Sequence, residues 1–409
     1  MAGQRGAGIL AGLRVIEISA FVAVPLAGAT LAAMGADVIR IDPIGGGVDV
    51  DRWPRWNDIS LYWAGLNAGK RSMTVDMSSA PGRDIVRRLI ATGGPDGGVV
   101  ITNLGARGWA SYESLREVRP DVILVHLQGA RDGSPAVDYT VNAGSGFPLV
   151  TGPDVDGPPV NHVLPAWDGM AGYLVATSLL AAERHRSRTG AGQLVTLSLN
   201  DVALAFASRL GIVAEAVSDP EPRGRYGNFT YGTFGKDFRT RDGRYVMIVA
   251  LTPGQWHRLK RATDLGAAFD AVAARGGLDL DTDDGRWAAR ESIAALIAGW
   301  VAARDLAEVQ RLLDAAGALW GTYRTFKQMA EDPEVSPANP MFAMVSQPGV
   351  GEYPMASTPM VFGAVQGRPV RTPPALGEHT DEILRDLLGM TDDEVAALRL
   401  QRVVGEPAA

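Results

Sequence analysis

Apolar runs typical of buried strands alternate with helix-like segments along the first third of the chain. The runs at residues 13–18 and 37–41 are rich in Val and Ile, and between them Pro25 suits the first turn of a helix. Such alternation predicts a parallel sheet covered by helices, an α/β fold. We predict strands at residues 13–18, 37–41, 98–102 and 121–128, with helices at 25–34 and 80–91.

The pattern changes in the rest of the chain. Residues 164–215 read as helical throughout, with one long helix from 168 to 187 that Gly190 closes. A hairpin is predicted at Asp242-Gly243, and a capping box from Thr391 to Glu394 begins a C-terminal helix. We predict four parts: a large domain that begins with residues 1–215, a linker at 216–236, a smaller α+β domain at 237–325, and at 326–409 a return segment with the C-terminal part of the large domain.

Composition narrows the class of protein. A chain of 409 residues is too long for one compact core, which agrees with two domains. The net charge of −7 argues against nucleic acid as a partner, and the lack of cysteine excludes disulfides and a thiol nucleophile. The first residues lack the apolar core of a signal peptide, and no run of ~20 apolar residues suits a membrane span. We therefore expect a cytoplasmic protein that has no membrane partner.

Two common kinds of site are disfavoured. The first strand, helix and second strand, followed by Asp42, imitate the dinucleotide-binding unit of a Rossmann fold. The turn at residues 19–25 has no G-x-G-x-x-G, however, so a plain βαβ scaffold is the better interpretation. The five histidines show no metal-ligand spacing, and we expect no metal.

Asp168 stands where the long helix is predicted to begin, and it has two interpretations. Asp is among the best residues for capping a helix N-terminus, so a purely structural role is open. The same position lets backbone N–H groups and the helix dipole keep a carboxylate ionised, as a nucleophile requires. Those N–H groups could also stabilise an oxyanion. The pattern alone does not choose between a cap and a nucleophile.

Basic side chains recur near the early predicted strands, several of them after a strand. Parallel sheets bind ligands at the carboxyl ends of their strands, so these positions favour a phosphate site, although most such residues are solvated surface charges. The residues are Arg40, Lys70, Arg71, Arg107 and Arg131.

Several segments, in order along the chain, resemble the family III CoA transferases. They are residues 12–19, 34–42, 67–76, 101–104, 181–193 and 376–380. The resemblance implies a Rossmann-like large domain built from both termini, a small domain between them, and an interlocked homodimer. It implies an acyl-CoA thioester as substrate, no separate cofactor because CoA is carried as part of the substrate, and Asp168 as the catalytic nucleophile. It places CoA contacts at Val22, Ala23, Arg40, Asn67, Lys70, Asn103, Leu104 and Arg107.

A narrower resemblance lies in residues 21–23, 42–47, 131–133, 137–142 and 161–168. It is to a branch of the family that moves CoA between the two carboxyl groups of one unsaturated dicarboxylic acid. It implies a substrate pocket that includes Phe21, Arg131, Asp138 and His162.

Other activities within the family stay open. Racemases of the family pair a histidine with the aspartate, and the segment after the strand at 121–128 has none. Some intermolecular transferases shield their site with adjacent glycines, whereas those at 227–235 are spread apart. We expect an intramolecular transferase, with an intermolecular transferase, a racemase and a non-catalytic CoA-binding protein as alternatives.

Overall fold

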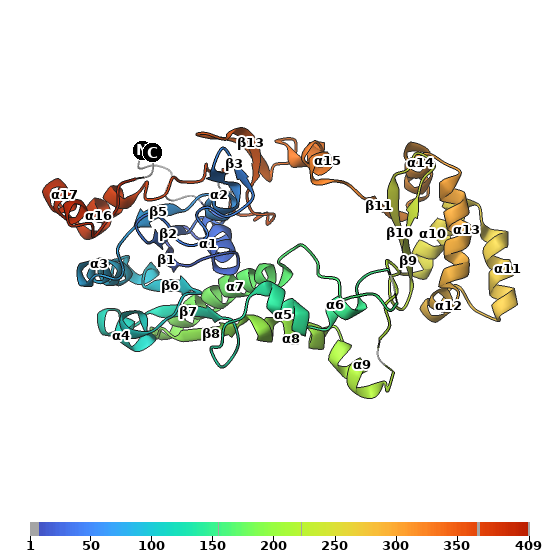
Figure 1. Ribbon diagram of the computed structural model, residues 1–409, viewed down its shortest axis with the longest axis horizontal. Coiled ribbons are helices and arrows are strands. Elements are labelled where there is room, and N and C mark those ends of the chain that lie inside the picture. The colour runs from blue at the N-terminus through green and yellow to red at the C-terminus, as the bar shows by residue number, and fades with distance from the viewer. Residues whose placement is uncertain (1–7, 154, 222, 366–368, 408–409) are drawn as a thin grey trace. The chain divides into compact units, whose positions relative to one another are not determined.

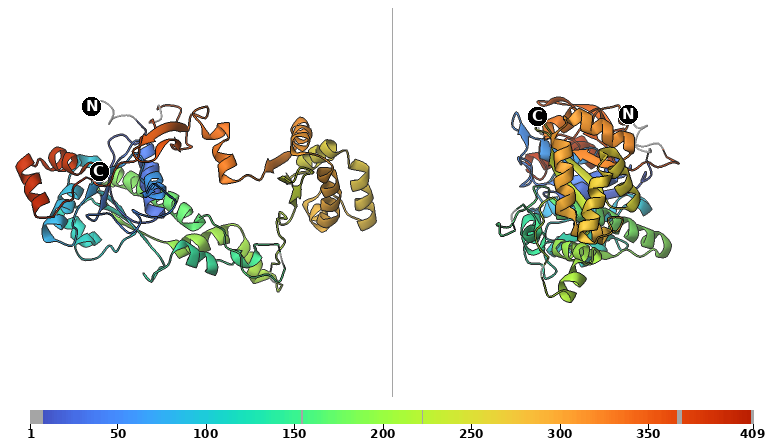
Figure 2. Two further views of the ribbon diagram at one scale, coloured as in Figure 1. Left: turned by 45° about the horizontal axis from the view of Figure 1, so that its top comes forward. Right: turned by 90° about the vertical axis from the view of Figure 1, so that its right-hand side faces the viewer.

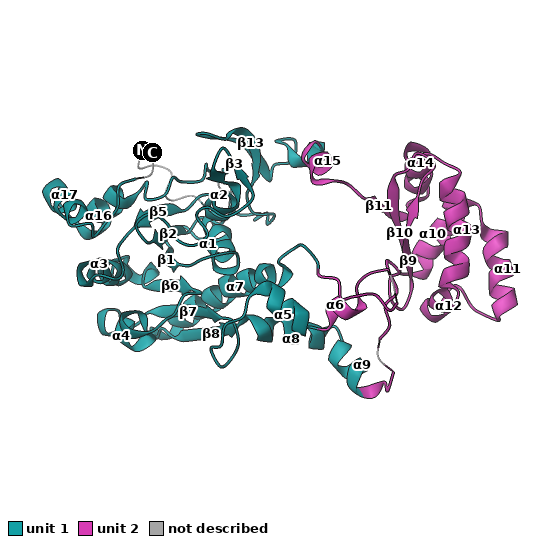
Figure 3. Cartoon of the chain, in the orientation of Figure 1, with its two compact units in different colours: residues 1–145, 162–217, 332–409 teal, residues 146–161, 218–331 magenta. Residues whose placement is uncertain are grey.

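The computed structural model describes residues 8–153, 155–221, 223–365 and 369–407. The chain forms two compact units, coloured separately in Figure 3. Unit 1 comprises residues 1–145, 162–217 and 332–409, and unit 2 comprises residues 146–161 and 218–331. The N-terminal residues 1–7, on which the expectation of no signal peptide partly rests, lie outside the described residues. Among the described residues, no helix is long and apolar enough to cross a membrane.

Unit 1 is built on a six-stranded sheet in which every pair of neighbours is parallel, in the order β5-β2-β1-β6-β7-β8 (Figure 1). The prediction of a parallel sheet is confirmed. The expectation that residues 164–215 are helical throughout is wrong at its centre, where β8 lies at the sheet edge. The strands are β1 (Arg14–Ile18), β2 (Asp37–Asp42), β5 (Arg71–Thr74), β6 (Val99–Thr102), β7 (Ile123–Gln128) and β8 (Leu194–Ser198).

Helices cover this sheet. Many begin where a Ser accepts a hydrogen bond from the first turn, as Ser79 does from Gly82 N–H at 3.1 Å. The helices are α1 (Ala23–Ala33), α2 (Leu61–Asn67), α3 (Ala80–Ala91), α4 (Tyr112–Val118), α5 (Asp138–Gly144), α7 (Ala166–Thr189), α8 (Leu199–Arg209), α9 (Ile212–Ser218), α16 (Thr380–Leu388) and α17 (Asp392–Leu400). Short hairpins add β3 (Arg55–Trp56) with β4 (Ile59–Ser60), and β12 (Phe342–Gln347) with β13 (Gly351–Ala356).

Helices α1 and α7 pack closely against each other (Figure 2). A Cβ at Gly172 of α7 would lie 2.7 Å from the carbonyl oxygen of Ala23, so only glycine fits there. This contact places the second turn of α7 beside the first turn of α1. Gly190 then ends α7 in the left-handed conformation, with φ 73°, as predicted.

The C-terminal segment joins the N-terminal part of unit 1 through β5. The backbone N–H of Thr74 donates to the hydroxyl of Thr380 at 3.2 Å, and the N–H of Gly377 donates to the hydroxyl of Ser72 at 2.9 Å. Helices α16 and α17 then contribute Ile383, Leu384 and other apolar side chains to the same core as the sheet. The capping box from Thr391 to Glu394 is confirmed.

Unit 2 has its own hydrophobic core and a three-stranded antiparallel sheet in the order β11-β10-β9. The predicted hairpin at Asp242-Gly243 joins two of these strands, and Gly243 has φ 78°. The elements are α6 (Phe147–Val150), β9 (Phe234–Arg239), β10 (Tyr245–Ala250), α10 (Pro253–Thr263), α11 (Gly266–Gly276), α12 (Asp283–Ala288), α13 (Arg290–Ala302), α14 (Leu306–Ala316), β11 (Leu319–Thr322) and α15 (Phe326–Ala330).

Candidate active site

A cavity of about 640 Å³ opens in unit 1 at the carboxyl ends of β1, β6 and β7. The strand order reverses between β1 and β6, which is where open α/β sheets bind ligands. Asn103, just after β6, joins the two strand ends: its side chain accepts from Ala20 N–H at 2.9 Å and donates to the Ala20 carbonyl at 2.7 Å. The lining residues are Phe21, Val22, Arg52, Trp53, Tyr62, Asn103, Leu127, Gln128, Gly129, Ala136, Val137, Asp138, Tyr139, Val163, Pro165, Asp168 and Leu199.

Asp168 lies in the first turn of α7 and lines this cavity, but it is not the helix cap. The carboxylate of Asp138 takes that role, because its Oδ2 accepts from the N–H groups of Trp167 at 2.8 Å and Asp168 at 3.1 Å. The Asp168 carboxylate itself makes no hydrogen bond with any described residue. The interpretation of Asp168 as a helix cap is therefore wrong, and its side chain lines the cavity without a capping role.

The electrostatic surroundings of Asp168 differ from those expected of a carboxylate at a helix start. Burial raises the pKa of Asp168 to about 6, the nearby Asp138 carboxylate adds to the increase, and the positive charge of Arg52 opposes it. The expectation that helix N–H groups hold Asp168 ionised is wrong, because Asp138 occupies those N–H groups. At neutral pH the carboxylate is still mostly ionised, yet weakly solvated.

The expectation of free N–H donors for an oxyanion at this helix start is also wrong. Besides the two N–H groups that Asp138 binds, Ala166 N–H donates to the Leu164 carbonyl at 2.8 Å. Gly169 N–H donates to the Pro165 carbonyl at 3.0 Å. A sequence pattern shows that N–H groups are exposed at a helix start, but it does not show which side chains fold back to bind them.

Arg40, Lys70 and Asn67 form a buried ionic cluster with Glu17 and Asp42, together with Asp49. Arg40 Nη2 donates to Asp42 Oδ1 at 2.8 Å, and Lys70 Nζ donates to Glu17 Oε1 and Asn67 Oδ1, both at 2.9 Å. Burial lowers the pKa of Lys70 to about 8, although Glu17 opposes the decrease. These three predicted CoA-binding side chains do not line the cavity.

The ionic cluster holds the loop that forms one wall of the cavity. Asp49 accepts from Arg40 Nη2 at 3.3 Å and also from the backbone N–H of Phe21 at 3.0 Å. Phe21 has φ 65°, a left-handed conformation that is uncommon for an aromatic residue and is held here by its surroundings. A Cβ at Gly28 of α1 would lie 1.7 Å from Glu17 Oε2, so glycine lets the helix pass over the cluster.

The other predicted site residues are divided between this cavity and its surroundings. Phe21, Val22, Asn103 and Asp138 line it, and Ala23 is buried at the start of α1. The side chain of Arg131 is 84% exposed and pairs with Asp201 at 3.0 Å, and neither Arg131 nor His162 lines the cavity.

A smaller apolar hollow of about 180 Å³ lies behind the loop after β6. Leu104 and Trp109 line it, and the exposed Arg107 follows Leu104 in the same loop. Asn103 and Leu104 therefore face different hollows although they are neighbours in sequence. Three cations are predicted to contact CoA, namely Arg40, Lys70 and Arg107, and of these only Arg107 is exposed.

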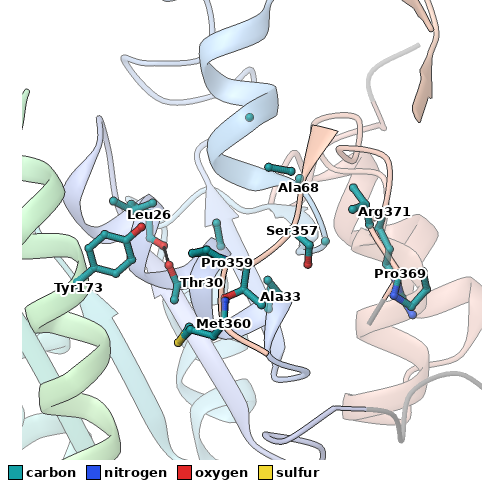
Figure 4. Close-up of a pocket in the computed structure, with 17 residues that line it drawn as sticks. Leu26, Thr30, Ala33, Ala68, Tyr173, Ser357, Pro359, Met360, Pro369 and Arg371 are labelled. Carbon is teal, nitrogen blue, oxygen red and sulfur yellow. Dashed lines mark hydrogen bonds between the residues drawn. The ribbon is translucent and has the colours of Figure 1, made fainter. Parts of the chain in front are cut away.

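A third hollow, of about 270 Å³, is shown in Figure 4. Small and apolar side chains of α1 and of the segment after β13 line it, with Tyr173 at one side and Arg371 at the other. The described residues around it include no carboxylate, so it offers no carboxylate nucleophile. The described residues also contain no group of three or more His, Asp or Glu side chains that could hold a metal ion.

Sequence reasoning missed Arg52 and Tyr62 in the cavity lining. Burial raises the pKa of Tyr62 to about 12, so its hydroxyl stays protonated. Arg52 precedes the short β3–β4 hairpin and Tyr62 lies in the first turn of α2, just after it. No strand or helix is predicted from the sequence in this region, so the sequence does not indicate which way these side chains face.

Known proteins resemble this chain over nearly its full length. The sequence model of CoA-transferase family III matches residues 10–380. The 2-methylfumaryl-CoA isomerase of Chloroflexus aurantiacus is 52% identical over 98% of this chain and 98% of its own length. The succinyl-CoA:mesaconate CoA-transferase of Haloarcula marismortui is 30% identical over 92% of this chain and 96% of its own. A crystal structure of a CAIB/BAIF family protein from Brucella suis has a TM-score of 0.75 at 26% identity, covering 92% of this chain and 98% of that one. The chain belongs to CoA-transferase family III.

Proposed function

We propose that this enzyme isomerises 2-methylfumaryl-CoA to 3-methylfumaryl-CoA by moving CoA from one carboxyl group of the acid to the other. The observation that carries this proposal is a carboxylate without hydrogen-bond partners among the described residues, Asp168, in a cavity at the switch point of the sheet. The identity of 52% with a 2-methylfumaryl-CoA isomerase supports the choice of substrate.

The proposed reaction is acyl exchange at Asp168. The carboxylate attacks the thioester carbonyl, the C–S bond breaks, and a mixed anhydride and CoA thiolate form. The thiolate then attacks the aspartyl carbonyl, which gives an aspartyl-CoA thioester and frees the first carboxyl group of the acid. The second carboxylate of the same acid attacks this thioester, and the same steps in reverse return Asp168 and form the isomeric thioester.

The surroundings of Asp168 suit these steps. Burial, which raises its pKa to about 6, removes water that would otherwise solvate the nucleophile or hydrolyse the anhydride. Asp138 positions the helix start, because its carboxylate binds two consecutive N–H groups there. Retention of the acid in the cavity makes the second transfer effectively unimolecular, an advantage of up to about 7–11 kcal/mol when the geometry is good.

We propose a path for CoA across the loop after β6. Val22 and Asn103 line the cavity where the thioester reacts, while Leu104 lines the apolar hollow on the other side of the loop. The exposed guanidinium of Arg107 is then available for a phosphate. Arg40, Asn67 and Lys70, being buried, would contribute by holding the loop at Phe21, while Ala23 begins the adjoining helix. A cytoplasmic homodimer of two interlocked chains, with no cofactor beyond the CoA of the substrate, completes the proposal.

Two measurements test this function. Purified enzyme is given unlabelled 2-methylfumaryl-CoA with an excess of labelled free acid, and the isomer is analysed for label. Intramolecular transfer leaves the product unlabelled, whereas label that enters at the rate of turnover would identify an intermolecular transferase. Trapping with hydroxylamine, followed by mass spectrometry, should modify Asp168.

A pair of variants assigns the nucleophile. Asp168→Ala should lose activity on the order of 10³-fold or more, because every covalent step passes through that carboxylate. Asp201→Ala, which removes a carboxylate outside the cavity, should retain activity. Near-normal turnover in a folded Asp168→Ala enzyme would refute the mechanism.

A further inference from the structure

Arg52 presents a cation to the cavity that holds Asp168. Of the described residues that line the cavity, Arg52 alone carries a positive charge. Its guanidinium carbon lies 5.3 Å from the ring centre of Phe21 and 5.5 Å from that of Tyr62. The guanidinium forms no ion pair or hydrogen bond with any described residue. Its planar set of N–H donors, which suits a carboxylate, is therefore unused.

The backbone of Arg52 is fixed on both sides. Its N–H donates to the Asp49 carbonyl at 3.2 Å, and its carbonyl accepts from the Ser60 hydroxyl at 2.6 Å. Asp49 also binds the N–H of Phe21 through its carboxylate. One buried residue, Asp49, thus holds the backbone of both Arg52 and Phe21. The backbone that carries the guanidinium is fixed by the fold, although the Arg52 side chain is exposed.

We propose that Arg52 binds the free carboxylate of the dicarboxylic acyl-CoA and retains the free acid while CoA is on Asp168. This inference rests on the proposed intramolecular transfer. Arg52 is a specificity-determining residue in this scheme, because it distinguishes a dicarboxylic acid from a monocarboxylic acid and keeps the reacting acid in the cavity.

The charge balance of the reaction favours this role. In the free enzyme the field of Arg52 acts on Asp168, and it opposes the increase in the pKa of that carboxylate. When Asp168 becomes a thioester it loses its charge, so Arg52 no longer has that counter-ion in the cavity. The released acid carries two carboxylates at that moment, beside the negative charge of Asp138. Among the described residues that line the cavity, Arg52 is then the one cation that can offset the repulsion between the acid's carboxylates and Asp138.

The sequence candidates for this role fit less well. Arg131 is paired with Asp201, and neither it nor His162 lines the cavity. Arg55, which lies near Arg52 in sequence, is placed 5.8 Å from the ring centre of Trp53 and is also absent from the lining.

The test compares Arg52→Gln and Arg52→Lys with wild type, and Arg131→Gln serves as a matched control. The first readout is kcat/KM for isomerisation of 2-methylfumaryl-CoA. The second is the rate at which label from the free acid enters the product, divided by the rate of turnover. The third is the rate at which Asp168 forms a covalent product, either the mixed anhydride or the aspartyl-CoA thioester, with crotonyl-CoA, a monocarboxylic thioester. Mass spectrometry detects this product. Thermal unfolding of each variant checks that it is folded.

With the dicarboxylic substrate, kcat/KM of Arg52→Gln should fall on the order of 10- to 100-fold. This is the loss expected when one charge-assisted hydrogen bond is removed. Label entry relative to turnover should rise, and Arg52→Lys should recover part of the loss. The rate with crotonyl-CoA should change much less. Arg131→Gln should match wild type in all three readouts.

Equal losses with the dicarboxylic and monocarboxylic thioesters would overturn the inference, since Arg52 would then act on the nucleophile alone. Unchanged activity and label retention in Arg52→Gln would also overturn it. Both outcomes leave the proposed function intact as long as the wild-type enzyme isomerises its substrate. A wild-type enzyme that fails to isomerise it would refute the proposed function and this inference together.

Discussion

Asp168 should lower the stability of the folded enzyme at neutral pH, and Asp168→Asn should reveal this. The substitution keeps the size of the side chain and removes its charge. Folding raises the pKa of Asp168 from 3.8 to about 6, chiefly through burial. The folded state therefore holds the proton more tightly than the unfolded state does. The stability that this proton provides is complete below pH 3.8 and is lost as the pH rises through about 6.

The magnitude follows from the same two values. Each whole step in pKa corresponds to about 1.4 kcal/mol, so the wild-type enzyme loses at most about 3 kcal/mol relative to Asp168→Asn at high pH. About 2 kcal/mol of this develops between pH 4.5 and 7.5. Partial exposure of Asp168 to solvent makes these upper limits. Any new hydrogen bond of the amide adds a constant, which cancels when the two pH values are compared.

The assay is urea unfolding of both proteins at pH 4.5, 6.0 and 7.5, at one protein concentration because association would also affect stability. Asp37→Asn is a control. Arg71 and Arg14 hold the pKa of Asp37 below its usual value despite burial. The stability that ionised Asp37 provides is therefore complete above pH 3.8 and is lost only at lower pH. The difference between Asp37→Asn and wild type should stay constant over this range. A constant difference for Asp168→Asn as well would refute the raised pKa.

Three further predictions concern the surroundings of the site. Arg40→Met should lower the free energy of unfolding in urea by about 3–5 kcal/mol, because it leaves Asp42 and Asp49 buried without their cation. Unfolding at the wild-type urea midpoint would refute a stabilising role of Arg40 in the ionic cluster. Arg107→Gln should raise KM for the CoA thioester several-fold with little change in kcat or in Tm, and a loss confined to kcat would argue against a phosphate contact. Sedimentation should find a homodimer, and an active monomer would refute the interlocked assembly.

Charges within buried strands could have predicted the ionic cluster. Strands of a parallel sheet read as nearly continuous apolar runs, so a lone charge within one indicates a buried partner. Glu17 interrupts β1 and Arg40 interrupts β2, and the two residues lie opposite each other in the sheet register. The prediction that Arg40 binds phosphate rests on its position near the end of a strand. Arg40 in fact lies within β2 and is buried, so its guanidinium pairs with carboxylates of the protein.

The cap of α7 could not be predicted from local pattern. Asp168 stands within the first turn, a position that suits a capping residue or an ionised nucleophile. The carboxylate that binds the helix start instead comes from Asp138, thirty residues earlier. Helix-start signals concern residues adjacent in sequence, whereas Asp138 reaches the helix only through the tertiary fold. The same limit hid Arg52, whose backbone is held beside the cavity by Asp49 and Ser60.

The sequence by itself determined the parallel sheet, the long helix that Gly190 ends, the hairpin at residues 242–243 and the family. These features depend on apolar periodicity, turn residues and ordered motifs, all of which are local in the chain. Only the tertiary structure decided that Arg40 and Lys70 are buried, that the pKa of Asp168 is raised, and that Arg52 lines the same cavity as Asp168. Burial and electrostatic potential are sums over neighbours brought together from distant parts of the chain, so they exist only once the sheet and its loops have folded.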